Sequence, residues 1–317
     1  MCRHHVKGGF PQSLLLAGPG VIIGAFIMGL FMYHVIPVDW NWNLCMVFGS
    51  ILAATDPVAV VALLKSAGAS PKLTILIVGE SLMNDGTAMV LFTLYFNMLK
   101  GDSYTGGEII LFFLKMAVGS PLFGMCSGFV SIYWISLLNK PLSPDDVTCQ
   151  IAITICCAYL TFFIAEYEFE MSGLLATCGA GVAFAWLAPP LILEHESMHH
   201  VWGILEWGGN TLLFLLAGVI IGKETLEVIS FIDWVYLFVL YLFLLALRAF
   251  IIAILYPILS NVGLKCDRQD AKFMAWAGLR GALGMALALI VQSNRTAGEA
   301  DISKNDASKV SVHVYVS

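Results

Sequence analysis

Two carboxylates, an amide and a hydroxyl lie close together in the stretch Gly79–Gly86, which reads Gly-Glu-Ser-Leu-Met-Asn-Asp-Gly. The surrounding run, about residues 73–99, is otherwise apolar enough to cross a bilayer. Charged side chains at membrane depth are costly and usually mark an ion pathway, a proton relay or an ion site. At ~100° per residue, Ser81 and Asp85 share one helix face, whereas Glu80 diverges from Asp85 by about 140°.

A second polar interruption, Thr55-Asp56-Pro57, falls inside an apolar run of about residues 44–64. Proline removes a backbone donor and disfavours helix at the residue before it. In lipid such a break is tolerated only where it is buried in protein or faces a cavity, and half-helices of this kind can coordinate ions. A plain proline kink, with Asp56 capping the second half, is the alternative interpretation.

The two polar stretches together predict a site for a hard cation, because such ions prefer oxygen ligands. The expected Na+ ligands are Asp85, Asp56, Thr55 and Ser81, with Asn84 beside them. Alternatively, these groups only hydrogen-bond one another and lock the helices together. Three acidic residues in two neighbouring spans favour the ion site.

Arg280 places a positive charge in the stretch Gly278-Leu279-Arg280-Gly281-Ala282-Leu283-Gly284. Its three glycines permit close packing and local unwinding. Arg280 needs an anion, because an uncompensated buried guanidinium would be prohibitive. We expect Glu80 to be this partner in a structural ion pair, which leaves Asp85 free to titrate. Arg248 and Glu206 are further charges in apolar runs, and either a structural or a transport role is open for them.

The composition identifies the class of protein that surrounds these residues. Of 317 residues 59% are hydrophobic and 12% are charged, with a mean hydropathy of +0.85. A soluble domain has a charged fraction of roughly 25%. Long apolar runs in place of alternating strands predict an all-α polytopic membrane protein with about nine spans. The expected spans cover residues 13–33, 44–64, 73–99, 109–138, 147–166, 171–190, 201–222, 232–259 and 270–291.

The basic residues of the connecting loops predict the orientation. One side receives eight of them, namely Arg3, Lys7, Lys65, Lys72, Lys140, Lys265, Arg268 and Lys272, and the other receives Lys100 and Lys223. This bias predicts a cytoplasmic N-terminus. The first span then enters from the cytoplasm and the span at 232–259 from outside, as inverted repeats require.

Three motifs in combination resemble the monovalent cation/proton antiporter family of Na+/H+ exchangers. They are Ala54-Thr55-Asp56-Pro57-Val58-Ala59-Val60, the stretch Gly79–Gly86, and Gly278-Leu279-Arg280-Gly281-Ala282. Asn41-Trp42-Asn43 and Leu63-Leu64-Lys65 make the chain most similar to the plant salt-overly-sensitive plasma-membrane antiporters and the related sperm exchangers. The resemblance runs from about residue 10 to 291.

The resemblance implies an inverted-repeat fold in which two broken helices, here at 44–64 and 270–291, cross each other. Core helices would occupy about 13–99 and 232–291, with scaffold helices at about 109–222. Because the family has about thirteen spans, we expect residues 1–291 to be a partial antiporter domain, truncated at both ends and followed by a polar tail, 292–317. Family members form homodimers. The first three helices of the family, which we expect to be absent from this chain, contribute to the dimer contact.

The resemblance also assigns roles to individual residues. Asp85 would be the ion- and proton-binding acid with Asn84 as its neighbour, Thr55, Asp56 and Ser81 would join the site, and Glu80–Arg280 would be structural. Asparagine at the position of Asn84 accompanies electroneutral exchange. The implied activity is secondary antiport of Na+, or K+ or Li+, against H+ by alternating access, in the plasma membrane. The resemblance implies neither an enzyme nor a cofactor or nucleic-acid partner.

Two other classes of protein compete with this interpretation. An intramembrane aspartyl protease also buries two aspartates, but it needs a Gly-x-Gly-Asp motif that this sequence lacks, and Arg280 would be unexplained. A non-transporting scaffold or sensor built on the exchanger fold stays open from the sequence, because several family helices are absent.

Overall fold

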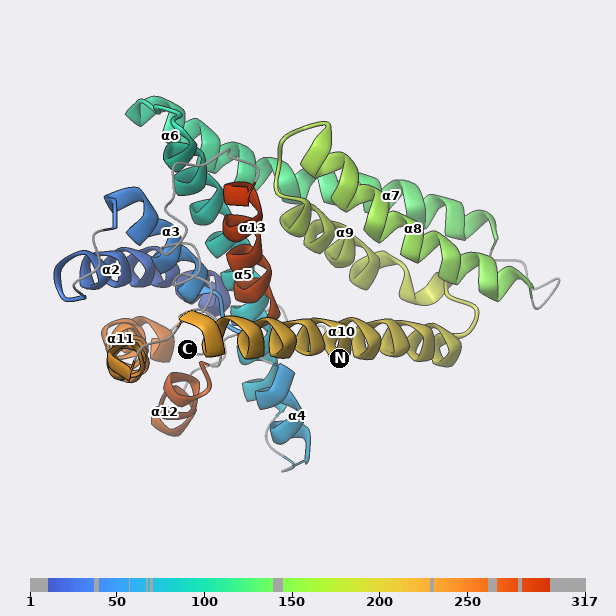
Figure 1. The fold of residues 1–317 in the computed structure, drawn as a ribbon. Coiled ribbons are helices and arrows are strands. Elements are labelled where there is room, and N and C mark those ends of the chain that lie inside the picture. Colours follow the sequence, from blue (N-terminus) through green and yellow to red (C-terminus); the bar gives the residue numbers. More distant parts are fainter. Residues whose placement is uncertain are drawn as a thin grey trace. The chain divides into compact units, whose positions relative to one another are not determined.

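Helices make up the regular structure of the chain wherever the structure describes it (Figure 1). The structure is a computed structural model, and it describes residues 11–36, 40–56, 58–66, 68, 71–138, 145–228, 231–261, 267–278 and 281–296. The predicted all-α class is therefore confirmed. Pro57, Arg280 and residues 297–317 lie outside the described residues, and the last helix continues to Thr296, beyond the expected end at 291.

Two compact units divide the chain. The first unit comprises Met1–Ser103 and Leu213–Ser317, and the second comprises Tyr104–Leu212. The first unit contains the polar stretch Gly79–Gly86 and both predicted helix breaks. The core and scaffold roles that the resemblance implies for the two parts of the chain stay predictions.

The first unit is built from long helices and four short half-helices. Its elements are η1 (Leu16–Gly20), α2 (Val21–His34), α3 (Trp42–Ala53), α4 (Val58–Ser66), α5 (Pro71–Lys100), α11 (Phe231–Asn261), α12 (Arg268–Trp276) and α13 (Ala282–Thr296). The π-turn η1 contains Pro19, which has no N–H to donate and so widens the helix locally. After Lys100, Gly101 takes φ +114°, a left-handed conformation that glycine adopts without strain and that ends α5.

Both predicted breaks are present as interruptions between short helices. Ala54 leaves the helix with φ −65° and ψ 136°, and Thr55 and Asp56 are non-helical between α3 and α4. Ala277, which follows the last residue of α12, leaves the helix with φ −72° and ψ 9°. A Cβ atom at Gly281 would overlap the side chain of Asp56, so the two breaks lie against each other and glycine is needed there.

Close packing of small residues holds the half-helices in place. A Cβ atom at Gly49 of α3 would overlap the carbonyl oxygen of Ala25 in α2. In lipid, helix association depends on such close van der Waals contact, because lipid tails are as apolar as the side chains. A buried cluster drawn from α2, α3, α5, α11 and α13 surrounds this contact and includes Met28, Phe48, Phe92, Leu240 and Leu287.

The second unit consists of α6 (Gly106–Leu114), η2 (Lys115–Gly119), α7 (Ser120–Leu137), α8 (Asp145–Tyr167), α9 (Gly173–Leu187), η3 (Pro189–Leu191) and the first half of α10 (His195–Val228). Gly124 of α7 and Gly179 of α9 let these two helices touch, since a Cβ atom at either would overlap backbone atoms of the other helix. Gln150 of α8 accepts from the N–H of Leu193 at 3.0 Å and donates to the carbonyl of Leu191 at 3.2 Å. These bonds fix the loop before α10.

Five helices of the described chain are long and apolar enough to cross a membrane. They are Pro11–His34, Lys72–Lys100, Gly106–Leu137, Asp146–Tyr167 and Trp234–Asn261. Two of the other expected spans are each divided by a break, the one at 171–190 forms the shorter α9, and the one at 201–222 lies within α10. Nine crossings therefore stay a prediction.

Candidate functional site

The polar stretch of α5 turns most of its side chains inward. Glu80, Ser81 and Asn84 are 4%, 3% and 2% exposed, and Thr55 from the break between α3 and α4 is 5% exposed. Asp85 and Asp56 are half-buried. A polar group without a hydrogen-bond partner at such depth costs free energy, so the partners of these groups define the site.

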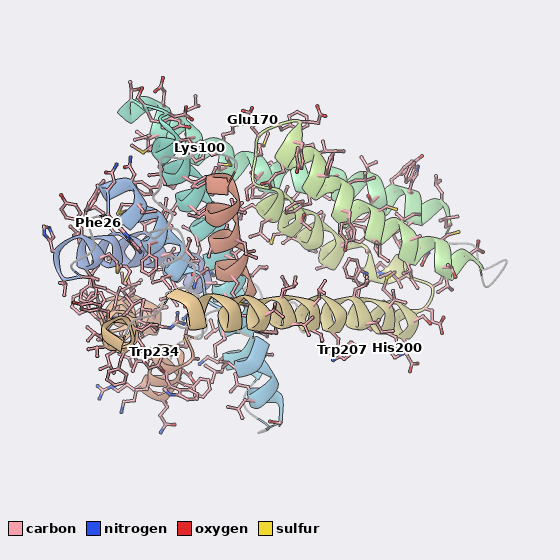
Figure 2. The ribbon with its side chains drawn as sticks, viewed as in Figure 1. Phe26, Lys100, Glu170, His200, Trp207 and Trp234 are labelled. Atoms are coloured by element: carbon pink, nitrogen blue, oxygen red, sulfur yellow. The ribbon has the colours of Figure 1, made fainter. Side chains whose placement is uncertain are left out.

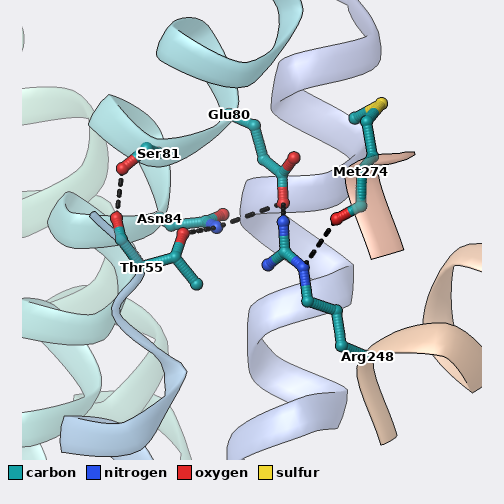
Figure 3. A network of polar contacts seen from close by, with 6 residues as sticks. All are labelled: Thr55, Glu80, Ser81, Asn84, Arg248 and Met274. Atoms are coloured by element: carbon teal, nitrogen blue, oxygen red, sulfur yellow. Dashed lines mark hydrogen bonds and ion pairs between the residues drawn. The ribbon is translucent and has the colours of Figure 1, made fainter. Parts of the chain in front are cut away.

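Thr55 is held to α5 by two hydrogen bonds (Figure 3). The Ser81 hydroxyl donates to the carbonyl oxygen of Thr55, and Asn84 Nδ2 donates to Thr55 Oγ1 at 3.0 Å. The first bond satisfies a carbonyl that the helix break leaves without its intrahelical partner. These bonds hold the non-helical segment against α5, and the role of Thr55, Ser81 and Asn84 at an ion site stays a prediction.

Asp85 lies one turn beyond Ser81 on α5 and interacts electrostatically with Asp56 of the break. Two carboxylates within electrostatic range repel each other when both are ionised. A bound proton or a bound cation would remove this repulsion, and oxygen atoms suit a hard cation. The arrangement is therefore chemically able to hold either ligand.

Glu80 forms a buried ion pair with Arg248 of α11. Arg248 Nη2 donates to Glu80 Oε1 at 2.9 Å, and Arg248 Nε donates to the carbonyl oxygen of Met274 in α12 at 2.9 Å (Figure 3). The Glu80 side chain is 5% exposed, and the Arg248 side chain is 15% exposed. A Cβ atom at Gly278 would overlap the Arg248 side chain, which explains that glycine.

The ion pair adds a partner of Glu80 that the sequence did not assign to it. The sequence predicted Arg280, which lies outside the described residues, so the pair Glu80–Arg280 stays a prediction. The partner that the structure describes is Arg248, for which the sequence left the role open. The available signal was the position of Arg248 deep in the apolar run 232–259, where a cation needs an anion.

Asn84 connects the ion pair to the broken helix. Its Nδ2 lies 3.5 Å from Glu80 Oε1, a long contact, in addition to its bond with Thr55. Polar atoms thus run from Arg248 through Glu80 and Asn84 to Thr55. A change in the orientation of one member would disturb its neighbours.

Further polar and aromatic side chains belong to the second unit. His195, His199 and His200 lie in the first turns of α10, and Glu206 follows on the same helix. Trp207 of this helix is 72% exposed (Figure 2). Within the described part of the chain, no three His, Cys, Asp or Glu side chains gather in a group that would hold a metal ion. The carboxylate and hydroxyl oxygens near Asp85 suit hard ions.

Known proteins resemble this chain over nearly its whole length. The family described as "Sodium/hydrogen exchanger, transmembrane" matches residues 1–316. "Sodium/hydrogen exchanger 8" of Arabidopsis thaliana is 38% identical over 92% of this chain and 39% of its own length. "Sodium/hydrogen exchanger 7" of the same plant is 36% identical over 95% of this chain and 26% of its own length. The chain thus spans well under half of these plant relatives.

Microbial proteins that are more distant in sequence also match this chain. "Na(+)/H(+) antiporter NhaP" of Pseudomonas aeruginosa is 29% identical over 87% of this chain and 65% of its own length. The fold matches the solved structure of the sodium proton antiporter MjNhaP1 from Methanocaldococcus jannaschii with a TM-score of 0.75 and 15% identity, over 99% of this chain and 78% of that one. The predicted resemblance is confirmed, and the chain is an integral membrane protein that belongs to the sodium/hydrogen exchanger family.

Proposed function

We propose that this chain carries the exchange site of a secondary antiporter that moves Na+ and H+ in opposite directions, with both ions competing for Asp85. The observation that carries the proposal is the acid pair of Asp85 and Asp56 at a helix break whose Thr55 is hydrogen-bonded to α5. The names of the relatives support the same two ions. The proposed Na+ ligands are Asp85, Asp56, Thr55 and Ser81.

Exchange follows from the shared site. If Asp85 holds either a proton or a cation, an empty carrier would have to cross the membrane with an uncompensated charge, which is costly. Loaded states therefore cross and empty ones do not. Movement of the helices that carry the site, relative to a scaffold, would expose Asp85 to alternate sides of the membrane.

Asn84 supports one proton for one cation. A neutral amide beside Asp85 contributes no second titrating charge, and here it is occupied in donating to Thr55 and toward Glu80. The cycle would then be electroneutral. K+ and Li+ are alternative substrates, because the same oxygen ligands accept any hard monovalent cation.

The setting of the transporter is part of the proposal. We propose a plasma-membrane protein with a cytoplasmic N-terminus, based on the loop charges and on the plant-type motifs. A homodimer is the proposed assembly, by analogy with the family.

The test is uptake of 22Na+ into proteoliposomes that hold the purified chain, driven by an outward proton gradient. We expect uptake by the wild-type chain and none by Asp85→Asn, which cannot exchange a proton for a cation. Glu196→Gln, at an exposed position in the first turn of α10, is the control and is expected to transport normally. Equal uptake by wild type and Asp85→Asn would contradict the role of Asp85. No uptake by the wild-type chain would instead favour a scaffold or sensor.

A further inference from the structure

A partly open cavity of about 60 Å³ lies within the first unit, on the side of Glu80 and Asn84. Its walls are mainly apolar and come from η1, α2, α3 and α11, including Gly20, Met28 and Ile251. Glu80, Asn84 and Arg248 supply its polar wall. Neither Asp85 nor Asp56 lines it, so it is separate from the proposed exchange site.

Two buried oxygen atoms on this polar wall lack a hydrogen-bond partner among the residues that the structure describes. They are Glu80 Oε2 and Asn84 Oδ1, on residues that are 4% and 2% exposed. An unsatisfied buried acceptor costs about 1–3 kcal/mol, and more when it is charged. Both residues line the same cavity, so one group of donors could satisfy both oxygens.

The chemistry of the wall indicates the donor. Glu80 is already neutralised by Arg248 at 2.9 Å, so a second cation would have no unpaired charge to bind. A neutral donor fits better, and the cavity exceeds the space of about 10–15 Å³ that one water needs, so it has room for bound water. A water at this place would have an ionised carboxylate and an amide oxygen within its reach, which are sufficient partners.

We propose that this cavity is a hydration site, in which ordered waters donate to Glu80 Oε2 and Asn84 Oδ1. The waters also fix the orientation of the Asn84 amide. Its Nδ2 faces two acceptors, Thr55 Oγ1 and Glu80 Oε1, and the opposite oxygen needs a donor to hold this arrangement. The site thus stabilises the hydrogen bond that holds Thr55 to α5. This inference is independent of whether the chain transports ions.

The experiment is hydroxyl-radical labelling of the full chain in lipid nanodiscs by short X-ray exposure, read as methionine oxidation by mass spectrometry. Radicals form from water in place, so a buried methionine is oxidised only beside bound water. Met28 lines the cavity and is 1% exposed, whereas Met32 and Met46 are 1% and 2% exposed and do not line it. We expect Met28 to be oxidised several-fold faster than either control.

A matched pair of glycine variants tests the place of the water. In Gly20→Ala the new Cβ would lie 3.5 Å from Ile251 Cγ2 and 3.6 Å from Leu255 Cδ1, ordinary contacts, and it takes up part of the cavity. Oxidation of Met28 should fall several-fold while that of Met46 is unchanged. Gly18→Ala, in the same π-turn but facing open space, should change neither.

Three results would overturn the proposal. If Met28 in the wild type is as protected as Met32 and Met46, the cavity is dry or filled by another side chain, and bound water is excluded. Equal oxidation of Met28 in Gly20→Ala and wild type places the water elsewhere. A fall at Met28 and Met46 together in Gly20→Ala shows a general tightening of the helices.

Discussion

Arg248 Nη2 donates to Glu80 Oε1 at 2.9 Å, and this bond joins α11 to α5 beside the helix break of Thr55. Arg248 also donates to the carbonyl of Met274, so one guanidinium connects three helices. Removing one member of a buried pair leaves the other charge uncompensated, which is more costly than removing both.

Single substitutions in this pair should therefore destabilise the chain more than the double substitution. We expect Glu80→Gln or Arg248→Met each to lower the free energy of unfolding by about 3–5 kcal/mol, with partial recovery when both are combined. Thermal unfolding in detergent, followed by tryptophan fluorescence, measures the effect.

The ion pair of Lys72 and Asp270 is the control. It has the same type of contact, at 3.2 Å, but its side chains are 28% and 22% exposed. Lys72→Met should cost about 0–1 kcal/mol, because exposed pairs gain little. If Lys72→Met proved as destabilising as Arg248→Met, burial would not explain the strength of the Glu80 pair.

Gly281 provides a test of the contact between the two helix breaks. Gly281→Ala places a methyl group where the Asp56 side chain lies, and we expect overpacking to cost about 1–3 kcal/mol and to displace Asp56. Uptake of 22Na+ should fall more than the amount of folded protein, which size-exclusion chromatography measures. Gly218→Ala, where no atom lies within 4 Å of the new Cβ, should leave both unchanged.

Much of the candidate site was predictable because polar residues stand out in an apolar chain. The stretch Gly79–Gly86 and the break at Thr55 are visible in the sequence. Helical spacing paired Ser81 with Asp85 on one face, and the structure adds that Ser81 and Asn84 both bond to Thr55. The sequence predicted Arg280 as the partner of Glu80 and did not assign Arg248 to it. Both are cations in apolar runs, and the choice depends on how α11 packs.

The glycine motif shows a second limit of prediction from the sequence. Three glycines within Gly278–Gly284 predict close packing or unwinding, but not which side chain needs the space. The structure identifies the neighbours as Arg248 at Gly278 and Asp56 at Gly281. These contacts join residues far apart in sequence, so local spacing gives no signal for them.

Competition between the two ions predicts a pH dependence of cation affinity. A cation binds only the deprotonated fraction of Asp85, so the apparent KM for Na+ should rise as the pH falls, by about tenfold per pH unit once the site is mostly protonated. The maximal rate at saturating Na+ should change less. Initial rates of 22Na+ uptake at several pH values, with equal pH on both sides, give both constants. An apparent KM that is independent of pH would contradict a shared site.

The amide of Asn84 predicts the charge balance of the cycle. Asn84→Asp adds a second carboxylate next to Asp85, and exchange should then move net charge and respond to membrane potential. The variant also loses the Nδ2 donor to Thr55 Oγ1, a bond of 3.0 Å, so a lower rate is expected as well.

In proteoliposomes with a valinomycin-set K+ potential, wild-type uptake should be unaffected and Asn84→Asp uptake should change with the sign of the potential. Thr55→Val, which removes the same hydrogen bond without adding charge, should slow uptake without making it voltage-dependent. Voltage-dependent uptake by the wild type would show that Asn84 does not confer electroneutral exchange.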